Sequence, residues 1–274
     1  MEKRTSWILT IADKLPIMST TAMDFMNLAK DPDASVEAMA RIISRDQVLA
    51  VRVLKLANSP FYGHAGRVRS LLKALMMVGL NATKSIVMTS VMRDLLRSSD
   101  EFEQSLWRHS TASALTAKAT ANAVNYRYPE DAFVAGLIRD IGLLVLYRVT
   151  PRVIKEICKK GGVSTLEEEN AVFGINHCQL GMEICRRWNF PEEIVQVLAH
   201  EVGAAGSASL LALIVHVAAR ICGTLGISLI HLPDLDAAQL VSARELGLTE
   251  LAIKSISEEI ASTFEGGKDY FLFA

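Results

Sequence analysis

Apolar residues recur at intervals of three and four along most of the chain, which is the spacing of one face of an α-helix. Ser35 and Asp46 each stand directly before such a run, and each is predicted to cap the N-terminal end of the helix that follows it. Ser70 opens a further helix, which Gly79 ends, and Asn81 opens the next. No run alternates apolar and polar residues as a half-buried strand does. The pattern therefore predicts an all-α fold built as a multi-helix bundle.

The chain divides by pattern into three parts. A polar stretch, RSSDEFEQ at 97–104, separates two helical blocks, although no Pro/Gly/Ser-rich linker marks the boundary. We expect an N-terminal helical part at 1–100, a helical core at 101–230 and a C-terminal helical extension at 231–274.

Composition narrows the class of protein. The 274 residues include 29 basic and 30 acidic side chains, so a net charge of −1 gives no overall field that attracts nucleic acid or anionic lipid. The four cysteines form no CxxC pair and predict reduced, mostly buried thiols. The N-terminus has no long apolar signal region, so we expect a cytoplasmic protein.

The most apolar segment, 208–230, approaches the length of a membrane span. It carries His216 and Arg220 near its middle, where a charged side chain is costly in a bilayer. We therefore predict a buried helix here, and no membrane attachment.

A charged pair interrupts the apolar helical run of AGLIRDIG, residues 135–142. Asp140 lies three residues after Leu137 and four before Leu144, which places it on the buried face, with Arg139 about 100° away toward the flank. A buried carboxylate must be hydrogen-bonded, paired or metal-bound. Neighbouring positions of a helix do not face one another, so the pattern does not identify Arg139 as that partner.

Three histidines in other predicted helices, His109, His177 and His200, are also of a residue type that binds divalent metals. His177 begins the apolar face of a helix at 177–188, and His200 lies in the last turn of the helix that follows Pro191. Spacing alone favours an ordinary hydrogen-bonded core or surface residue for each of them.

Five segments, taken in order, resemble the HDOD family, bacterial proteins related to the HD superfamily of metal-dependent phosphohydrolases. They are LANSPFYG (56–63), SLWRHS (105–110), AFVAGLIRDIGLLVL (132–146), EEENAVFGINHCQLGMEICRRWNFPEEIVQVLAHE (167–201) and VHVAARIC (215–222). The resemblance covers roughly residues 10–225. It implies an HD-domain-like helical core with an N-terminal helical subdomain, a regulatory role in signalling and, for most members, loss of catalysis.

The resemblance also implies where a metal centre would lie in the catalytic relatives. That centre uses a first histidine, a His-Asp doublet, a later aspartate and, in cyclic-dinucleotide phosphodiesterases, further histidines. By motif the corresponding positions are His109, Arg139, Asp140, His177, His200, Glu201 and Arg220. Arg139 and Glu201 stand where histidine is common, and Arg220 stands where the enzymes have aspartate. Because a guanidinium has no lone pair for a metal and stays protonated, we predict a vestigial site with no metal, no cofactor and no catalytic residue.

Three uses of these positions stay open. Arg139 or Arg220 could pair with Asp140 as a lock between helices, the arginines could bind a phosphate or carboxylate, or a residual metal site could persist. The leading interpretation is a non-catalytic regulatory module, a pseudoenzyme that acts through protein binding. Whether it also binds a nucleotide or an anion stays open. The alternative is a metal-dependent phosphohydrolase that acts on a nucleotide or cyclic dinucleotide.

Partners are expected to be signalling proteins, namely a kinase, a response regulator or a cyclic-dinucleotide enzyme, because no such domain is recognised in the sequence itself. A small anionic ligand and a homodimer are open alternatives. The helix-glycine-helix rhythm of 70–87 is weakly similar to a DNA-binding helix-turn-helix, but the charges near it are typical of a solvated face. Nucleic acid is not an expected partner.

Overall fold

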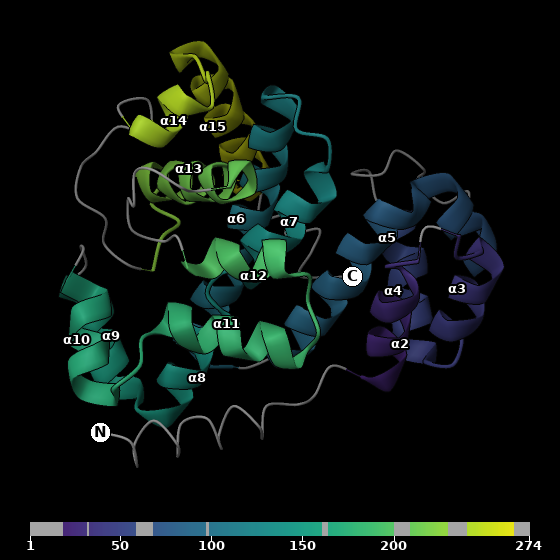
Figure 1. Ribbon diagram of the computed structural model, residues 1–274, viewed down its shortest axis with the longest axis horizontal. Coiled ribbons are helices and arrows are strands. Elements are labelled where there is room, and N and C mark those ends of the chain that lie inside the picture. Colours follow the sequence, from purple (N-terminus) through teal and green to yellow (C-terminus); the bar gives the residue numbers. More distant parts are fainter. Residues whose placement is uncertain are drawn as a thin grey trace. The chain divides into compact units, whose positions relative to one another are not determined.

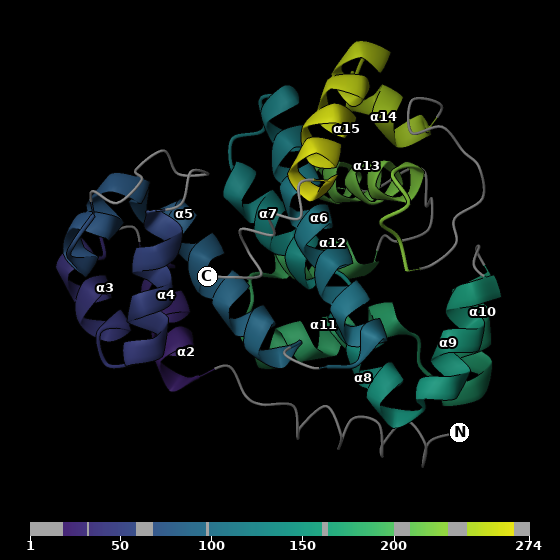
Figure 2. The same ribbon diagram turned by 180° about the vertical axis from the view of Figure 1, so that it is seen from behind.

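A computed structural model of the chain describes residues 19–31, 33–58, 68–96, 99–160, 164–199, 209–229 and 240–265. Within these residues the secondary structure is helical, with no strand, so the prediction of an all-α fold is confirmed (Figures 1 and 2). The described residues fall into two compact units, which meet in sequence between Leu95 and Leu96, next to the polar stretch at 97–104.

The smaller unit consists of four helices, drawn in purple to blue in Figure 1. They are α2 (Thr20–Leu28), α3 (Val36–Ile43), α4 (Gln47–Ala57) and α5 (Leu71–Leu95). Ser35 Oγ accepts a hydrogen bond from Ala38 N at 3.1 Å, and Asp46 Oδ1 accepts one from Leu49 N at 3.0 Å. Both predicted caps are thereby confirmed. Gly79 has a φ of 80° and interrupts α5, at the place where the sequence predicts that one helix ends and another begins.

Asn58 fixes the end of α4. Its side-chain amide donates to the carbonyl oxygens of Leu54 and Val68, both at 2.9 Å, and Val68 N donates to its Oδ1 at 3.0 Å. The rest of the NSPFYG motif lies outside the described residues. Through these three hydrogen bonds Asn58, the first residue of the motif, joins the end of α4 to the chain before α5.

Among the described residues one helix, α5, is long and apolar enough to cross a membrane by length and composition alone. The non-helical backbone of Gly79 divides it, and it packs against α2, α3 and α4. Its second half also buries hydroxyl side chains, including those of Thr83 and Ser90. These features are those of the core helix of a globular unit.

The larger unit is built around α6 (Glu101–Ala123), which packs against α7, α13 and α15. The remaining helices of this unit are α7 (Pro129–Ile138), α8 (Ile141–Val149), α9 (Pro151–Lys160), α10 (Ser164–Phe173), α11 (His177–Arg187), α12 (Glu192–Ala199), α13 (Leu210–Thr224), α14 (Val241–Glu245) and α15 (Glu250–Glu265) (Figure 1). The apolar segment around His216 is α13, a largely buried helix as predicted.

The apolar run around AGLIRDIG forms two helices rather than the single helix that the sequence predicts. α7 ends at Ile138 and α8 begins at Ile141, with Asp140 as the N-terminal flanking residue of α8. Asp140 is 2% exposed, which confirms the prediction that it is buried. The prediction assumed one continuous helix, and that premise is wrong. Almost every side chain on both sides of the break is buried, so no amphipathic period marks the boundary.

Both glycines of AGLIRDIG lie where backbones of different helices approach closely. A Cβ on Gly136 would lie 2.7 Å from the carbonyl oxygen of Ser113 in α6, and one on Gly142 would lie 2.0 Å from the carbonyl oxygen of His177 in α11. Real Cβ atoms do not come this close to backbone atoms. The two glycines therefore allow α7 to pack on α6 and α8 to pack on α11, which holds the Arg139-Asp140 turn between them.

Candidate functional site

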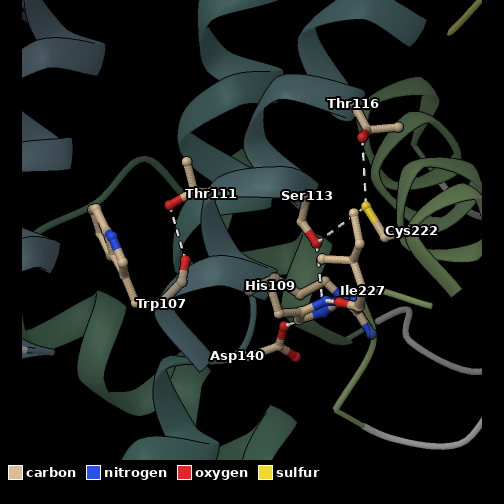
Figure 3. Close-up of polar contacts among 9 residues, drawn as sticks. Trp107, His109, Thr111, Ser113, Thr116, Asp140, Cys222 and Ile227 are labelled. Atoms are coloured by element: carbon tan, nitrogen blue, oxygen red, sulfur yellow. Dashed lines mark hydrogen bonds and ion pairs between the residues drawn. The ribbon is translucent and has the colours of Figure 1, made fainter. Parts of the chain in front are cut away.

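One face of α6 carries the polar side chains that begin the site. His109, Ser113 and Thr116 follow one another at intervals of four and three, and all are buried. Figure 3 shows this face directed toward Cys222 of α13, whose Sγ lies 4.0 Å from Ser113 Oγ and 3.4 Å from Thr116 Oγ1. Burial raises the pKa of the Cys222 thiol, so it acts as a neutral hydrogen-bonding group here.

The ring of His109 joins three segments of the chain. Its Nδ1 lies 2.7 Å from the carbonyl oxygen of Ile227, beyond α13, and its Nε2 lies 3.1 Å from Oδ2 of Asp140 (Figure 3). The contact with Ile227 is a hydrogen bond, and the contact with Asp140 Oδ2 is an ion pair by distance, without hydrogen-bond geometry. His109 and Asp140 then form a buried ion pair between α6 and the turn before α8.

Ser113, His109 and Asp140 do not form a nucleophilic triad, although the residue types match one. Ser113 Oγ lies 3.5 Å from His109 Nε2, and Asp140 is bound at the same nitrogen. A triad places serine and aspartate at opposite nitrogens, so that one proton can pass from serine to histidine. The geometry is that of a hydrogen-bonded core cluster.

Arg139 and Arg220 add positive charge to the same place. Arg139 Nη1 lies 3.8 Å from Asp140 Oδ2, and its side chain is only 13% exposed. The half-buried Arg220 has its pKa lowered by burial and then by the neighbouring charge of Arg139. The expectation that Arg139 points to the flank was wrong, because the turn between α7 and α8 lets consecutive side chains meet.

His177 is held by a carboxylate that was not among the predicted site residues. Glu169 in α10 accepts from His177 N at 2.7 Å, and its two oxygens lie 2.7 and 2.8 Å from His177 Nδ1. Both residues are buried. Thr165, Glu169 and Phe173 recur at intervals of four and are all buried, so the helical period of α10 was a signal that could have found Glu169.

The candidate residues are only partly brought together. His109 and Arg139 both contact Asp140, and Arg220 lies on α13, which packs against α6 and α7. His200 and Glu201 lie outside the described residues. Burial raises the pKa of Cys158 to about 12, and Glu169, His177 and Asp140 all act on this thiol. A Cβ on Gly142, two residues after Asp140, would meet the His177 backbone, so Asp140 and the His177–Glu169 pair lie in the same neighbourhood of the larger unit.

Among the described residues, the donor atoms do not form a set that fits a metal ion. In the described part of the chain, no group of three or more His, Cys, Asp or Glu side chains is placed to hold one. His109 and Asp140 offer two donors, fewer than the three protein ligands of typical catalytic sites. Arg139, 3.8 Å from the Asp140 carboxylate, would also repel a dication bound there.

The sequence profile of the HDOD domain family matches residues 15–203. An uncharacterised protein from Treponema pallidum (strain Nichols) is 22% identical over 190 residues, which are 68% of this chain and 37% of that protein. The chain thus spans little more than a third of the length of this curated relative.

Solved structures share the fold. A crystal structure of an HDOD domain protein of unknown function from Geobacter sulfurreducens has a TM-score of 0.77 and 24% identity, over 98% of this chain and 99% of its own. A candidate phosphohydrolase from Shewanella amazonensis SB2B gives 0.75 and 20%, over 97% of each chain. A candidate signal transduction protein from Marinobacter aquaeolei VT8 gives 0.77 and 22%, over 95% of this chain and 60% of that one. With the family profile matching more than half of its length and this helical fold around an HD-like core, the chain belongs to the HDOD domain family.

Proposed function

We propose that this protein is a non-catalytic regulatory module of signal transduction, which acts through binding and not through metal-dependent hydrolysis. One observation carries the proposal: Asp140, the central carboxylate of the site, is engaged by His109 at 3.1 Å and by Arg139 at 3.8 Å. Membership of the HDOD family supports the signalling role.

Hydrolysis of a phosphoester at a metal centre requires a metal-bound water whose pKa the ion lowers. Nε2 of His109 would have to offer its lone pair to the ion, but it lies 3.1 Å from the Asp140 carboxylate, in an ion pair that a bound metal would break. The Shewanella protein described as a candidate phosphohydrolase is 20% identical, which supports a common fold and no common activity.

We infer that input and output come from signalling proteins, such as a kinase, a response regulator or a cyclic-dinucleotide enzyme. The smaller unit offers apolar side chains for such a contact. Val48 and Val51 lie one helical turn apart on α4 and are 59% and 51% exposed. Exposed valines at this spacing can contribute to a protein interface.

Metal analysis and an activity assay test the non-catalytic assignment on the purified full chain. We expect far less than one metal ion per chain, and no hydrolysis of bis-p-nitrophenyl phosphate, p-nitrophenyl phosphate or cyclic di-GMP with added Mn²⁺ or Fe²⁺. One or two tightly held ions per chain, together with turnover that Asp140→Asn abolishes, would overturn the proposal.

A matched variant makes the negative result informative. The double substitution Arg139→His with Arg220→Asp replaces two cations by two metal donors at the positions that the family resemblance points to. We expect this variant to bind Mn²⁺ more tightly than the wild type does. Equal binding by the two proteins would mean that the arginines are not what excludes the ion.

A further inference from the structure

An exposed stripe on α4 combines apolar and basic side chains. Val48, Val51 and Lys55 follow one another at intervals of three and four, so they share one face of the helix, and all three are exposed. The face that packs into the smaller unit carries other residues, among them the buried Leu49 and Val53. The two exposed valines are therefore not part of the core of this unit.

The first half of α5 carries a second stripe of the same kind. Lys73, Met76 and Met77 lie within one helical turn and are all exposed, Met76 by 59% and Met77 by 37%. The core side of this half-helix is made by Ala74 and Leu75, which are buried. Both helices thus present apolar side chains to the outside, each with a lysine beside them.

The two stripes lie beside one buried cluster. Its members are Ala57 of α4, Val68 and Ala74 of α5, with the partly buried Leu54 and Val78 packed against them. Lys55 directly follows Leu54, and Met77 directly precedes Val78. α4 and α5 also lie side by side in both views (Figures 1 and 2). Val48, Val51, Lys55, Lys73, Met76 and Met77 are called the α4–α5 surface below.

The charge of this part of the chain has one sign. Residues 47–93 contain no aspartate or glutamate but seven basic residues, namely Arg52, Lys55, Arg67, Arg69, Lys73, Lys84 and Arg93. The two carboxylates that border the segment are engaged, since Asp46 caps α4 and Asp94 pairs with Arg52 at 2.5 Å. A surface in such a segment is complementary to a partner that carries carboxylates.

We propose that the α4–α5 surface binds an acidic amphipathic helix of a partner protein. The apolar side chains of that helix pack on the valines and methionines, and its glutamates or aspartates face Lys55 and Lys73. Apolar anchors one helical turn apart are the usual way in which such a helix is held, and flexible methionine side chains adapt to it. The proposal rests on the regulatory function proposed above and specifies the partner's charge and shape.

Two other anionic partners fit the surface less well. Interfaces with nucleic acid are more polar than those between proteins, whereas four of the six side chains here are apolar. Helices that lie on an anionic membrane insert tryptophan, phenylalanine or leucine. Valine and methionine provide the exposed apolar side chains of the α4–α5 surface, with no aromatic ring among them.

The test measures binding of a fluorescent synthetic peptide to the full chain by anisotropy. The peptide has about 20 residues, enough to form a helix, with leucine at positions i, i+3, i+4 and i+7 and glutamate on its flanks. We expect saturable binding that weakens as salt is added. A peptide with lysine in place of each glutamate should bind at least about tenfold more weakly, a difference that the opposite charges account for.

Variants of the α4–α5 surface separate its two kinds of side chain. Val51→Asp should weaken binding of the acidic peptide about tenfold, because it places a carboxylate in the apolar contact. Lys55→Glu combined with Lys73→Glu should weaken the acidic peptide and strengthen the basic one. A folding defect cannot produce this reversal of preference.

Matched controls lie in the larger unit. Leu251 is 77% exposed on α15, and Lys159 is exposed on α9. Leu251→Asp and Lys159→Glu should both leave binding of the acidic peptide unchanged. Equal losses for Val51→Asp and Leu251→Asp would mean that the peptide does not bind at the α4–α5 surface.

Three further results would overturn the proposal. The first is no saturable binding of the acidic peptide, and the second is tighter binding of duplex DNA or of phosphatidylserine vesicles than of the peptide. The third is a dimer in sedimentation that Val51→Asp dissociates, which would assign the surface to a second copy of the chain. Each of these results leaves the non-catalytic assignment standing, because metal analysis and the hydrolysis assays decide that separately.

Discussion

Asp140 connects several parts of the larger unit through one buried carboxylate. It contacts His109 of α6 and its own neighbour Arg139, and His109 continues the connection to the carbonyl oxygen of Ile227. The carboxylate makes no side-chain hydrogen bond that caps α8, although Asp140 flanks that helix. Its contribution to stability therefore comes mainly from the cations and not from helix capping.

Replacing Asp140 by alanine should lower the free energy of unfolding by about 3 kcal/mol, because the substitution leaves buried cations without their counter-charge. Urea unfolding measures this loss. A double-mutant cycle of His109→Gln and Asp140→Asn should give a coupling energy of about 1 kcal/mol or more, since the two side chains are in direct contact.

The control for this prediction is an exposed ion pair, Arg152 with Glu156 on α9. Glu156→Ala should change the stability by about 0.5 kcal/mol at most, because solvent screens such pairs. A loss below about 1 kcal/mol for Asp140→Ala would contradict the assignment of a buried ion-pair network.

The burial of Asp140 could be predicted from the sequence, but its surroundings could not. The partners of the carboxylate are set by a turn that consecutive side chains share and by a histidine about thirty positions earlier, and neither is encoded in a local period. Glu169 is the opposite case. Its place on the buried stripe of α10 was visible in the sequence, but it was hidden in a run of three glutamates that is otherwise typical of a solvated helix.

At the level of helices, glycines set the distances on which the site depends. Gly142 brings α8 against the backbone of His177 at the start of α11, where an added methyl group would overlap a carbonyl oxygen. Gly247 offers a contrast, since it has a φ of 69° and nothing within 4 Å of an added Cβ. The first glycine is required by packing, and the second by backbone conformation alone.

Gly142→Ala should therefore destabilise the protein more than Gly247→Ala does. We expect a loss of about 3 kcal/mol for Gly142→Ala, because overpacking forces the helices apart. The strained backbone should cost Gly247→Ala about 1 kcal/mol. Urea unfolding of the two variants gives the comparison, and equal losses would show that the approach of α8 to α11 adjusts without cost.

A second contact between elements lies at the start of α6. Asp100 caps this helix by accepting from Phe102 N at 2.8 Å and Glu103 N at 3.2 Å, and it accepts from the hydroxyl of Tyr147 in α8 at 2.8 Å. The hydrogen bond from Tyr147 is the largest cause that lowers the pKa of Asp100 below its ordinary value of 3.8. The ionised carboxylate thus favours the folded state.

The pH dependence of stability follows from the sign of this shift. A carboxyl group with a lowered pKa in the folded state stabilises that state above its unfolded pKa, and this contribution disappears as the pH falls through the folded pKa. Between about pH 5 and pH 3, Tyr147→Phe should therefore lose less stability than the wild type, because its Asp100 titrates closer to the ordinary value. Thermal unfolding at each pH measures the two slopes.

Tyr128→Phe is the control for this pH profile, since Tyr128 is exposed and precedes α7. Its slope should follow that of the wild type. A Tyr147→Phe profile parallel to the wild type would mean that Asp100 does not depend on the hydroxyl for its lowered pKa.

The sequence predicted helix boundaries well where a polar cap or a glycine marks them, and poorly inside the core. The caps at Ser35 and Asp46 were visible because each sits between a polar turn and an apolar run. The break between α7 and α8 has no such contrast, since buried residues continue through both helices. Packing against α6 and α11 decides that boundary, and packing is not local in sequence.

For the whole molecule, the fold class could be predicted because helical period persists along most of the chain, and the family resemblance supplied the architecture. Assembly of the site could not be derived in the same way. His109, Arg139, Arg220 and Ile227 come from four segments that meet only through the packing of α6, α7 and α13. The resemblance identified His109, Arg139 and Arg220 as site positions but not Ile227, and their contacts come from the packing of the helical core.

All four cysteines are free and buried, as the sequence predicted, namely Cys158, Cys178, Cys185 and Cys222. Their reaction with a thiol reagent therefore measures how far the larger unit opens. Burial raises the pKa of Cys158 and of Cys185 to about 12. Only the thiolate is nucleophilic, so burial and the raised pKa leave few of these thiols reactive at pH 8. The native protein should therefore react slowly with a disulfide reagent such as Ellman's reagent, and all four thiols should react once urea unfolds it.

The reaction rate of Cys222 also tests the ion pair at Asp140. Cys222 lies beside Ser113 and Thr116 on the face of α6 that also carries His109, so its reaction requires α13 to separate from α6. Asp140→Asn should speed the reaction of Cys222 more than that of Cys185, whereas Glu156→Ala should change neither rate. Equal acceleration of both thiols by Asp140→Asn would mean that the whole unit opens together and that the ion pair does not act locally on α13.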